Sequence, residues 1–193
     1  MLGLVLPTDP RWTDIANKNI HEILVDHAYC EQKAASSGIS IIVQYPEKAR
    51  LVEVLTAIVA EEWSHFERVL HELRKRGMTL GQQRKDEYVI KLNALIIQGG
   101  SREHQVVEKL LINALIEARS CERFRLLSKE ISDPGLSDFY HELMVSEAGH
   151  YKTFLSLAKE YMDPEVVEAR WREILVAEAE IVKHLEVRGD RMH

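Results

Sequence analysis

The sequence has few cysteines, glycines and prolines: two Cys, nine Gly and five Pro among 193 residues. The two cysteines, Cys30 and Cys121, lie far apart in the chain and form no Cys-x-x-Cys pair. This excludes a zinc ribbon and a rubredoxin-type iron site, and it is typical of a protein in a reducing compartment. A chain of this length buries roughly 70% of its unfolded surface, so its core needs no disulfide.

Long apolar runs and an excess of basic residues are also absent. No segment approaches the ~20 consecutive apolar residues of a membrane span, and the apolar stretch 1–6 is too short for a signal peptide and ends at Pro7. We therefore expect a cytoplasmic protein with no membrane partner. The net charge of -6, from 31 acidic and 25 basic residues, argues at first sight against a nucleic acid partner.

The scarce glycines and prolines divide the chain into long segments with helical periodicity. Three segments open on Asp-Pro, with Asp as the expected N-cap and Pro in the first turn. Gly38 and Gly77 are expected to end two helices, and Ser101 to cap another. The expected helices cover residues 11–37, 46–76, 86–98, 102–131, 134–161 and 164–188. The only candidate strand is 39–43.

These segments predict an all-α fold. Four long helices are expected to form a bundle, with a crossover helix inserted between the second and the third and an additional helix at the C-terminal end. The whole chain, residues 1–193, is expected to be a single domain.

Each of the four long segments carries a Glu in its apolar stripe, where the side chain should face the core. In segment 46–76, for example, the stripe Leu55 and Ile58 continues with Glu62 and His65 in steps of three and four. Segment 134–161 repeats this Glu-x-x-His pattern. The inward polar residues are Glu31, Glu62, His65, Glu117, Glu147 and His150.

The spacing of these six residues repeats between the two halves of the chain. The offset is 86 residues for the first Glu and 85 for the second Glu and the His. Each half supplies one Glu from one helix and Glu-x-x-His from the next, which is the ligand set of dinuclear carboxylate proteins in four-helix bundles. Glu and His three residues apart share a helix face, and this oxygen-rich set suits iron or manganese. Cations would also offset four carboxylates that are costly to bury.

Other polar residues near these positions have plainer explanations. Glu61 and Glu122 point off the apolar stripes. His27 is expected to be a core histidine or one that supports a ligand, and Cys121 a small core residue, with cavity lining as the alternative. Glu-x-x-His alone is a weak motif, so the alternative for the whole set is a buried polar network without metal.

Basic residues cluster around the crossover and along segment 102–131. The simplest interpretation is that these residues lie on solvated helix faces, and the alternative is that they form a surface that contacts phosphates. Four of the 31 acidic residues belong to the expected buried set, so the net charge of -6 excludes a basic docking face less firmly than it suggests at first sight. The clustered residues are Arg74, Lys75, Arg76, Arg84, Lys85, Arg102, Arg119, Arg123, Arg125 and Lys129.

The residues around the six positions resemble a known group. Glu31, Glu62-Trp63-Ser64-His65, Glu117 and Glu147-Ala148-Gly149-His150 resemble the di-iron site of the ferritin-like superfamily. Within it, the chain length, the inserted crossover helix and the contexts of residues 29–35 and 115–120 resemble the MiaE family over nearly the whole chain. Its members are tRNA hydroxylases that act on 2-methylthio-N6-isopentenyladenosine beside the anticodon.

The resemblance implies a ferritin-like fold and a non-haem di-iron monooxygenase that hydroxylates the isopentenyl group of that nucleoside, with O2 as co-substrate. The implied ligands of the two iron ions are Glu31 with His65 and Glu117 with His150, and the implied bridges are Glu62 and Glu147. The implied partners are modified tRNA and an external reductase or ferredoxin, because the chain has no dinucleotide-binding motif, no flavin motif and no cysteine cluster. DNA is not expected.

Other functions of such a bundle stay open at this point. They are iron oxidation and storage as in ferritin, peroxide detoxification as in rubrerythrin, and the manganese catalase reaction. The missing Cys-x-x-Cys pairs weaken the rubrerythrin alternative. Iron storage would require a hollow assembly, and the crossover helix and the additional C-terminal helix would have to fit the interfaces between its subunits. The non-enzymatic alternative is a helical binding module with a buried polar network.

Overall fold

The computed structural model describes residues 2–192, and within that range all regular structure is helical. The helices are α1 Arg11–Asn17, α2 Ile20–Gln44, α3 Ala49–Lys75, α4 Glu87–Asn93, α5 Arg102–Glu130, α6 Pro134–Tyr161 and α7 Pro164–Lys183. The predicted all-α class, with four long helices, an inserted short helix and an additional C-terminal helix, is confirmed. Among the described residues, no helix has both the length and the hydrophobicity that crossing a bilayer requires.

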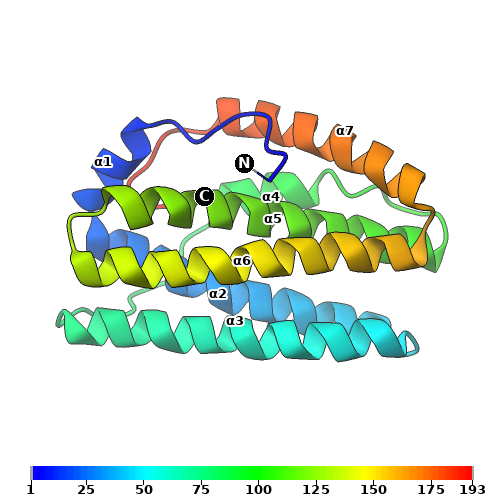
Figure 1. Ribbon diagram of the computed structural model, residues 1–193, viewed down its shortest axis with the longest axis horizontal. Coiled ribbons are helices and arrows are strands. Elements are labelled where there is room, and N and C mark those ends of the chain that lie inside the picture. The colour runs from blue at the N-terminus through cyan, green and yellow to red at the C-terminus, as the bar shows by residue number, and fades with distance from the viewer. Residues whose placement is uncertain (1, 193) are drawn as a thin grey trace. The chain divides into compact units, whose positions relative to one another are not determined.

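The chain divides into two compact units. One consists of residues 14–85 and 188–192 and is built on α2 and α3, which lie side by side (Figure 1). The other consists of residues 2–13 and 86–187 and contains α4 to α7. In this second unit α5 and α6 pack along their length, and α7 contacts α4, α5 and α6.

The first predicted helix, residues 11–37, begins correctly at Arg11 but is wrong in its continuity and in its end. It is interrupted after Asn17, and α2 continues past Gly38 to Gln44, so the candidate strand 39–43 is helical. Gly38 does not end the helix. A Cβ atom at this position would lie 2.5 Å from Val59 Cγ2, so the glycine permits a close approach of α2 and α3.

Other predicted boundaries depend on local capping, and most of these are confirmed. The side chains of Ser101 and Asp133 accept backbone N–H groups at the starts of α5 and α6, and Asp163 does the same for α7. Gly77 has a φ of 68°, the left-handed conformation expected after a helix end. Three helices are shorter than predicted, because α3 begins at Ala49, α4 ends at Asn93 and α7 ends at Lys183.

Candidate metal centre

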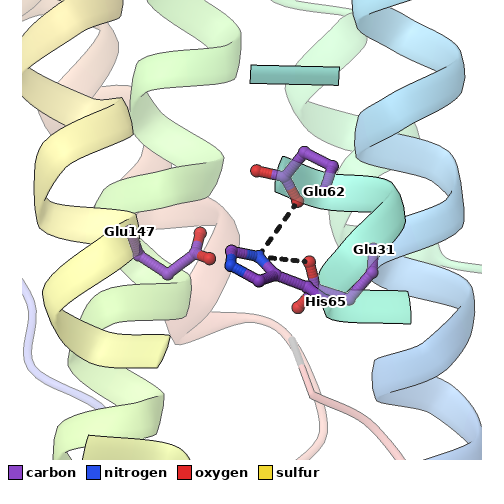
Figure 2. A group of neighbouring side chains, drawn as sticks. All are labelled: Glu31, Glu62, His65 and Glu147. Atoms are coloured by element: carbon purple, nitrogen blue, oxygen red, sulfur yellow. Dashed lines mark ion pairs between the residues drawn. The ribbon is translucent and has the colours of Figure 1, made fainter. Parts of the chain in front are cut away.

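In the unit built on α2 and α3, three of the predicted residues come together. Glu31 projects from α2, and Glu62 and His65 project from one face of α3, where the three-residue spacing aligns them. All three are buried among the apolar residues of the same stripes, such as Ile58 and Val69. Figure 2 shows the carboxylates of Glu31 and Glu62 directed toward the His65 ring.

The distances within this group suit a shared cation. His65 Nδ1 lies 3.6 Å from Glu31 Oε2 and 3.8 Å from Glu62 Oε2. One ligand atom from each of the three residues lies within 4.8 Å of the others. Carboxylate oxygens and one imidazole nitrogen form a donor set that suits iron or manganese.

The electrostatics of this group favour positive charge. Burial, reinforced by repulsion from Glu62, raises the pKa of Glu31 to about 8. Burial alone would lower the pKa of His65, but the carboxylates of Glu31 and Glu62 outweigh it and raise that pKa to about 9. The group therefore retains protons at a pH where exposed Glu side chains have long released theirs.

His27 supports the group without joining it. Its Nε2 lies 2.6 Å from Oε1 of Glu31, one turn further along α2, and its ring is fully buried. Burial, with the nearby His65 charge, lowers the pKa of His27 to about 3, so the ring is neutral at physiological pH. The prediction that this histidine is a core residue is confirmed, and its support of a metal ligand stays a prediction.

The unit containing α5 and α6 carries the matching set. Glu117 projects from α5, and Glu147 and His150 project from α6. His150 Nδ1 lies 4.0 Å from Glu117 Oε2, and one ligand atom from each of the three lies within 4.8 Å of the others. These residues and the α2–α3 group are each no more than 5% exposed. The internal repeat thus produces one Glu, Glu, His group in each unit.

The neighbours that sequence reasoning set aside lie elsewhere. Glu61 is exposed on α3. Cys121 is buried, and its thiol donates to the Met144 carbonyl at 3.3 Å, as expected of a small core residue. Glu122 points off the stripe of α5, but it is buried, and its carboxylate accepts from the Thr8 backbone and hydroxyl.

A buried ion-pair cluster around Arg119 was not predicted. Arg119 was grouped with the solvated basic residues, but its guanidinium is fully buried and contacts Glu122 and Glu178. Tyr88 Oη also donates to Glu178 Oε1, at 3.0 Å. A signal existed, because Glu178 continues the apolar stripe of α7 through Trp171 and Ile174.

Several residues of the predicted basic clusters have acidic partners. Arg76 pairs with Glu72, and Arg84 pairs with Glu22 and Asp190. Arg123 lies over the Trp12 ring, with its guanidinium carbon 4.2 Å from the ring centroid. These contacts reduce the positive charge that the clusters present to a phosphate backbone.

Comparison with known families places these groups in context. A family model described as tRNA-(MS[2]IO[6]A)-hydroxylase (MiaE) matches residues 3–193. A Pseudomonas putida protein named tRNA 2-(methylsulfanyl)-N(6)-isopentenyladenosine(37) hydroxylase is 35% identical, over 92% of this chain and 85% of its own length. A Salmonella typhimurium protein of the same name is 25% identical, over 91% of this chain and 82% of its own.

A solved structure is also similar over most of its length. It is described as protein 43 with aldehyde deformylating oxygenase activity, from Synechococcus. The TM-score is 0.93 at 33% sequence identity, with 98% of this chain and 94% of the other chain covered. That protein has a ferritin-like fold, which confirms the predicted fold class.

Proposed function

Because the chain belongs to the MiaE family of tRNA hydroxylases, we propose that it hydroxylates the isopentenyl group of 2-methylthio-N6-isopentenyladenosine in tRNA. The reaction inserts one atom of O2 into an allylic C–H bond of that group. The other oxygen atom leaves as water after uptake of two electrons and two protons. The observation that carries this proposal is the family match over residues 3–193, joined to a buried Glu, Glu, His group in each unit.

The metal centre is the first part of this proposal. We propose that the two groups together hold one dinuclear iron site and that residues 1–193 act as a single domain. Glu31 with His65 would hold one iron, Glu117 with His150 would hold the other, and Glu62 and Glu147 would be shared between the two ions. The donor chemistry fits, because the buried carboxylates need positive charge and Glu31 and His65 retain protons in its place. When bound, the two iron ions supply O2 activation and oxidising power.

The chain's own residues contribute binding, orientation and exclusion of water. Glu62 and His65 are held at fixed spacing by the α3 backbone, and Ile58 and Val69 cover the same stripe on either side. Leu143 and Phe154 bracket the Glu147 and His150 pair on α6 in the same way. These apolar neighbours keep bulk water from the ligands, which strengthens their interaction with a cation.

Electrons have to come from another protein. We propose a reductase or ferredoxin as the donor, because the sequence has no dinucleotide-binding motif, no flavin motif and no cysteine cluster. The remaining partner is tRNA that already carries the isopentenyl and methylthio groups, and the place of action is the cytoplasm.

A second candidate is the deformylation of an aldehyde. The Synechococcus protein similar to this chain is described as having aldehyde deformylating oxygenase activity. A dinuclear carboxylate centre in a helical bundle is compatible with both substrates, so the choice between them depends on the pocket and on the docking surface for tRNA.

The test is product analysis with labelled oxygen. Iron-loaded protein, an electron donor and 18O2 are incubated with tRNA containing the substrate nucleoside, and in parallel with an aldehyde. We expect the tRNA nucleoside to gain one labelled oxygen atom. An unlabelled oxygen in the product nucleoside, which would have come from water, or conversion of the aldehyde alone would overturn the proposal. Mineral growth with excess iron would indicate storage instead.

Paired variants connect this activity to the centre. Glu62→Ala should lose iron and hydroxylation together, because it removes a buried ligand. Glu61→Ala changes the neighbouring, exposed Glu and should leave both unchanged. Equal effects of the two variants would contradict the ligand assignment.

A further inference from the structure

We propose that His27 is a positioning residue that holds one oxygen of Glu31, so that Glu31 presents its other oxygen to the metal and the two metal positions become unequal. The inference rests on the proposed dinuclear site. His27 lies outside the six proposed ligands, and both His27 and Glu31 belong to the α2–α3 unit.

The two oxygens of Glu31 have different surroundings. Oε1 lies 2.6 Å from His27 Nε2, a short hydrogen-bond distance between buried groups. Oε2 lies on the side of the other ligands, 3.6 Å from His65 Nδ1. Because His27 precedes Glu31 by four residues on α2, the helix itself keeps the two side chains adjacent.

The direction of this hydrogen bond follows from metal binding. A ligating Glu31 is ionised, and an ionised carboxylate can only accept hydrogen bonds. His27 Nε2 therefore carries the hydrogen and donates it to Oε1. This contact fixes the rotation of the carboxylate and leaves Oε2 as the oxygen that faces the metal. The same contact occupies Nε2, so that nitrogen is not a ligand.

The other half of the repeat has a different residue at this position. Asn113 precedes Glu117 by four residues, as His27 precedes Glu31, and it follows His27 by 86 residues. Its amide Nδ2 donates to the Lys109 carbonyl at 2.8 Å, within α5. The six ligands repeat between the halves, but the residue one turn before the first Glu does not. The two metal positions are therefore supported by different chemistry.

Loss of a side chain that orients a ligand typically weakens metal affinity by about 10- to 100-fold. We expect His27→Ala to weaken binding at one position by this factor and to leave the other position intact. His27→Gln retains an amide N–H that can donate to the carboxylate, and it should restore part of the affinity. Asn113→Ala, the matched control on α5, should change either affinity by less than about threefold.

The experiment is an anaerobic titration of metal-free protein with Co2+, followed by Mössbauer spectra after loading with 57Fe2+. Wild type should bind two ions and show two distinct iron signals. His27→Ala should bind one ion as wild type does and the second more weakly, with one signal altered. Circular dichroism verifies folding, and if the alanine variant is unfolded, His27→Gln decides by its affinity and spectrum.

The outcomes separate this inference from the proposed function. Two unchanged affinities and unchanged signals in a folded His27 variant overturn the positioning role while the dinuclear site stands. Wild-type protein that binds no metal overturns the dinuclear site, and the positioning role with it. Equal effects of the His27 and Asn113 variants show that the halves are equivalent, which also overturns the inference.

Discussion

Removing the Arg119 side chain should destabilise the protein strongly. Its guanidinium donates to Glu178 Oε1 from Nε at 3.0 Å and from Nη2 at 2.7 Å, and to the Leu6 carbonyl at 2.9 Å. It also pairs with Glu122. Without it, two buried carboxylates lose their cation.

The magnitude follows from burial. Burial raises the pKa of Glu178 even though Arg119 opposes it, so the ion pair does not fully offset the loss of water around the carboxylate. Such a pair stabilises little compared with apolar residues, but breaking it by removing one partner typically costs about 3–5 kcal/mol. We therefore expect Arg119→Met to lower the free energy of unfolding by about that amount.

The assay is urea denaturation of metal-free protein, followed by far-ultraviolet circular dichroism. Metal-free protein is used because Arg119 lies two residues from Glu117 and bound metal would complicate two-state unfolding. Arg50→Ala removes an exposed pair with Glu53 and should lower stability by less than about 1 kcal/mol. Glu178→Gln combined with Arg119→Met should recover part of the loss. A loss below about 1 kcal/mol for Arg119→Met would refute the reasoning.

Three further outcomes are expected. Metal binding at pH 7 should release protons, because Glu31 and His65, with pKa values of about 8 and about 9, must lose their protons to become ligands. Titration calorimetry in buffers of different ionisation enthalpy measures this release, and a heat of binding that does not depend on the buffer would contradict it. A thiol reagent at pH 8 should label half-buried Cys30 and spare Cys121, because burial raises the pKa of Cys121 to about 11. Mass spectrometry of the labelled peptides measures the difference, and equal labelling of the two cysteines would be the contrary result. Asp133→Ala should lower the free energy of unfolding by about 0.5–2 kcal/mol, because the carboxylate accepts hydrogen bonds from two N–H groups at the start of α6. Urea denaturation measures the change, and an unchanged free energy would contradict the capping role.

The helices that the sequence predicted best are those with local signals at their ends. Ser101 and Asp133 cap α5 and α6 through residues two or three positions away, and both starts were predicted correctly. The prediction that Gly38 ends a helix is wrong, because the glycine is required by packing against another helix and not by a local turn. Its missing Cβ makes room for Val59 of α3, which no local pattern reveals.

The candidate ligands were also predictable, because each is defined by periodicity within one helix. Glu62 and His65 share the face of Ile58 and Val69, and the same steps recur on α6. Helix geometry is local, so spacing alone indicates which side chains point inward. The ligand role assigned to these residues is still a prediction that metal analysis has to test.

The tertiary structure decided which inward side chains meet. Arg119 and Glu178 are 59 residues apart, and only the packing of α7 on α5 pairs them and buries the arginine. His27 and Glu31 are one turn apart, yet their hydrogen bond depends on a side-chain conformation that burial selects. Periodicity follows from the backbone of a single helix and can be read from the sequence, whereas these contacts depend on how distant helices and side chains pack.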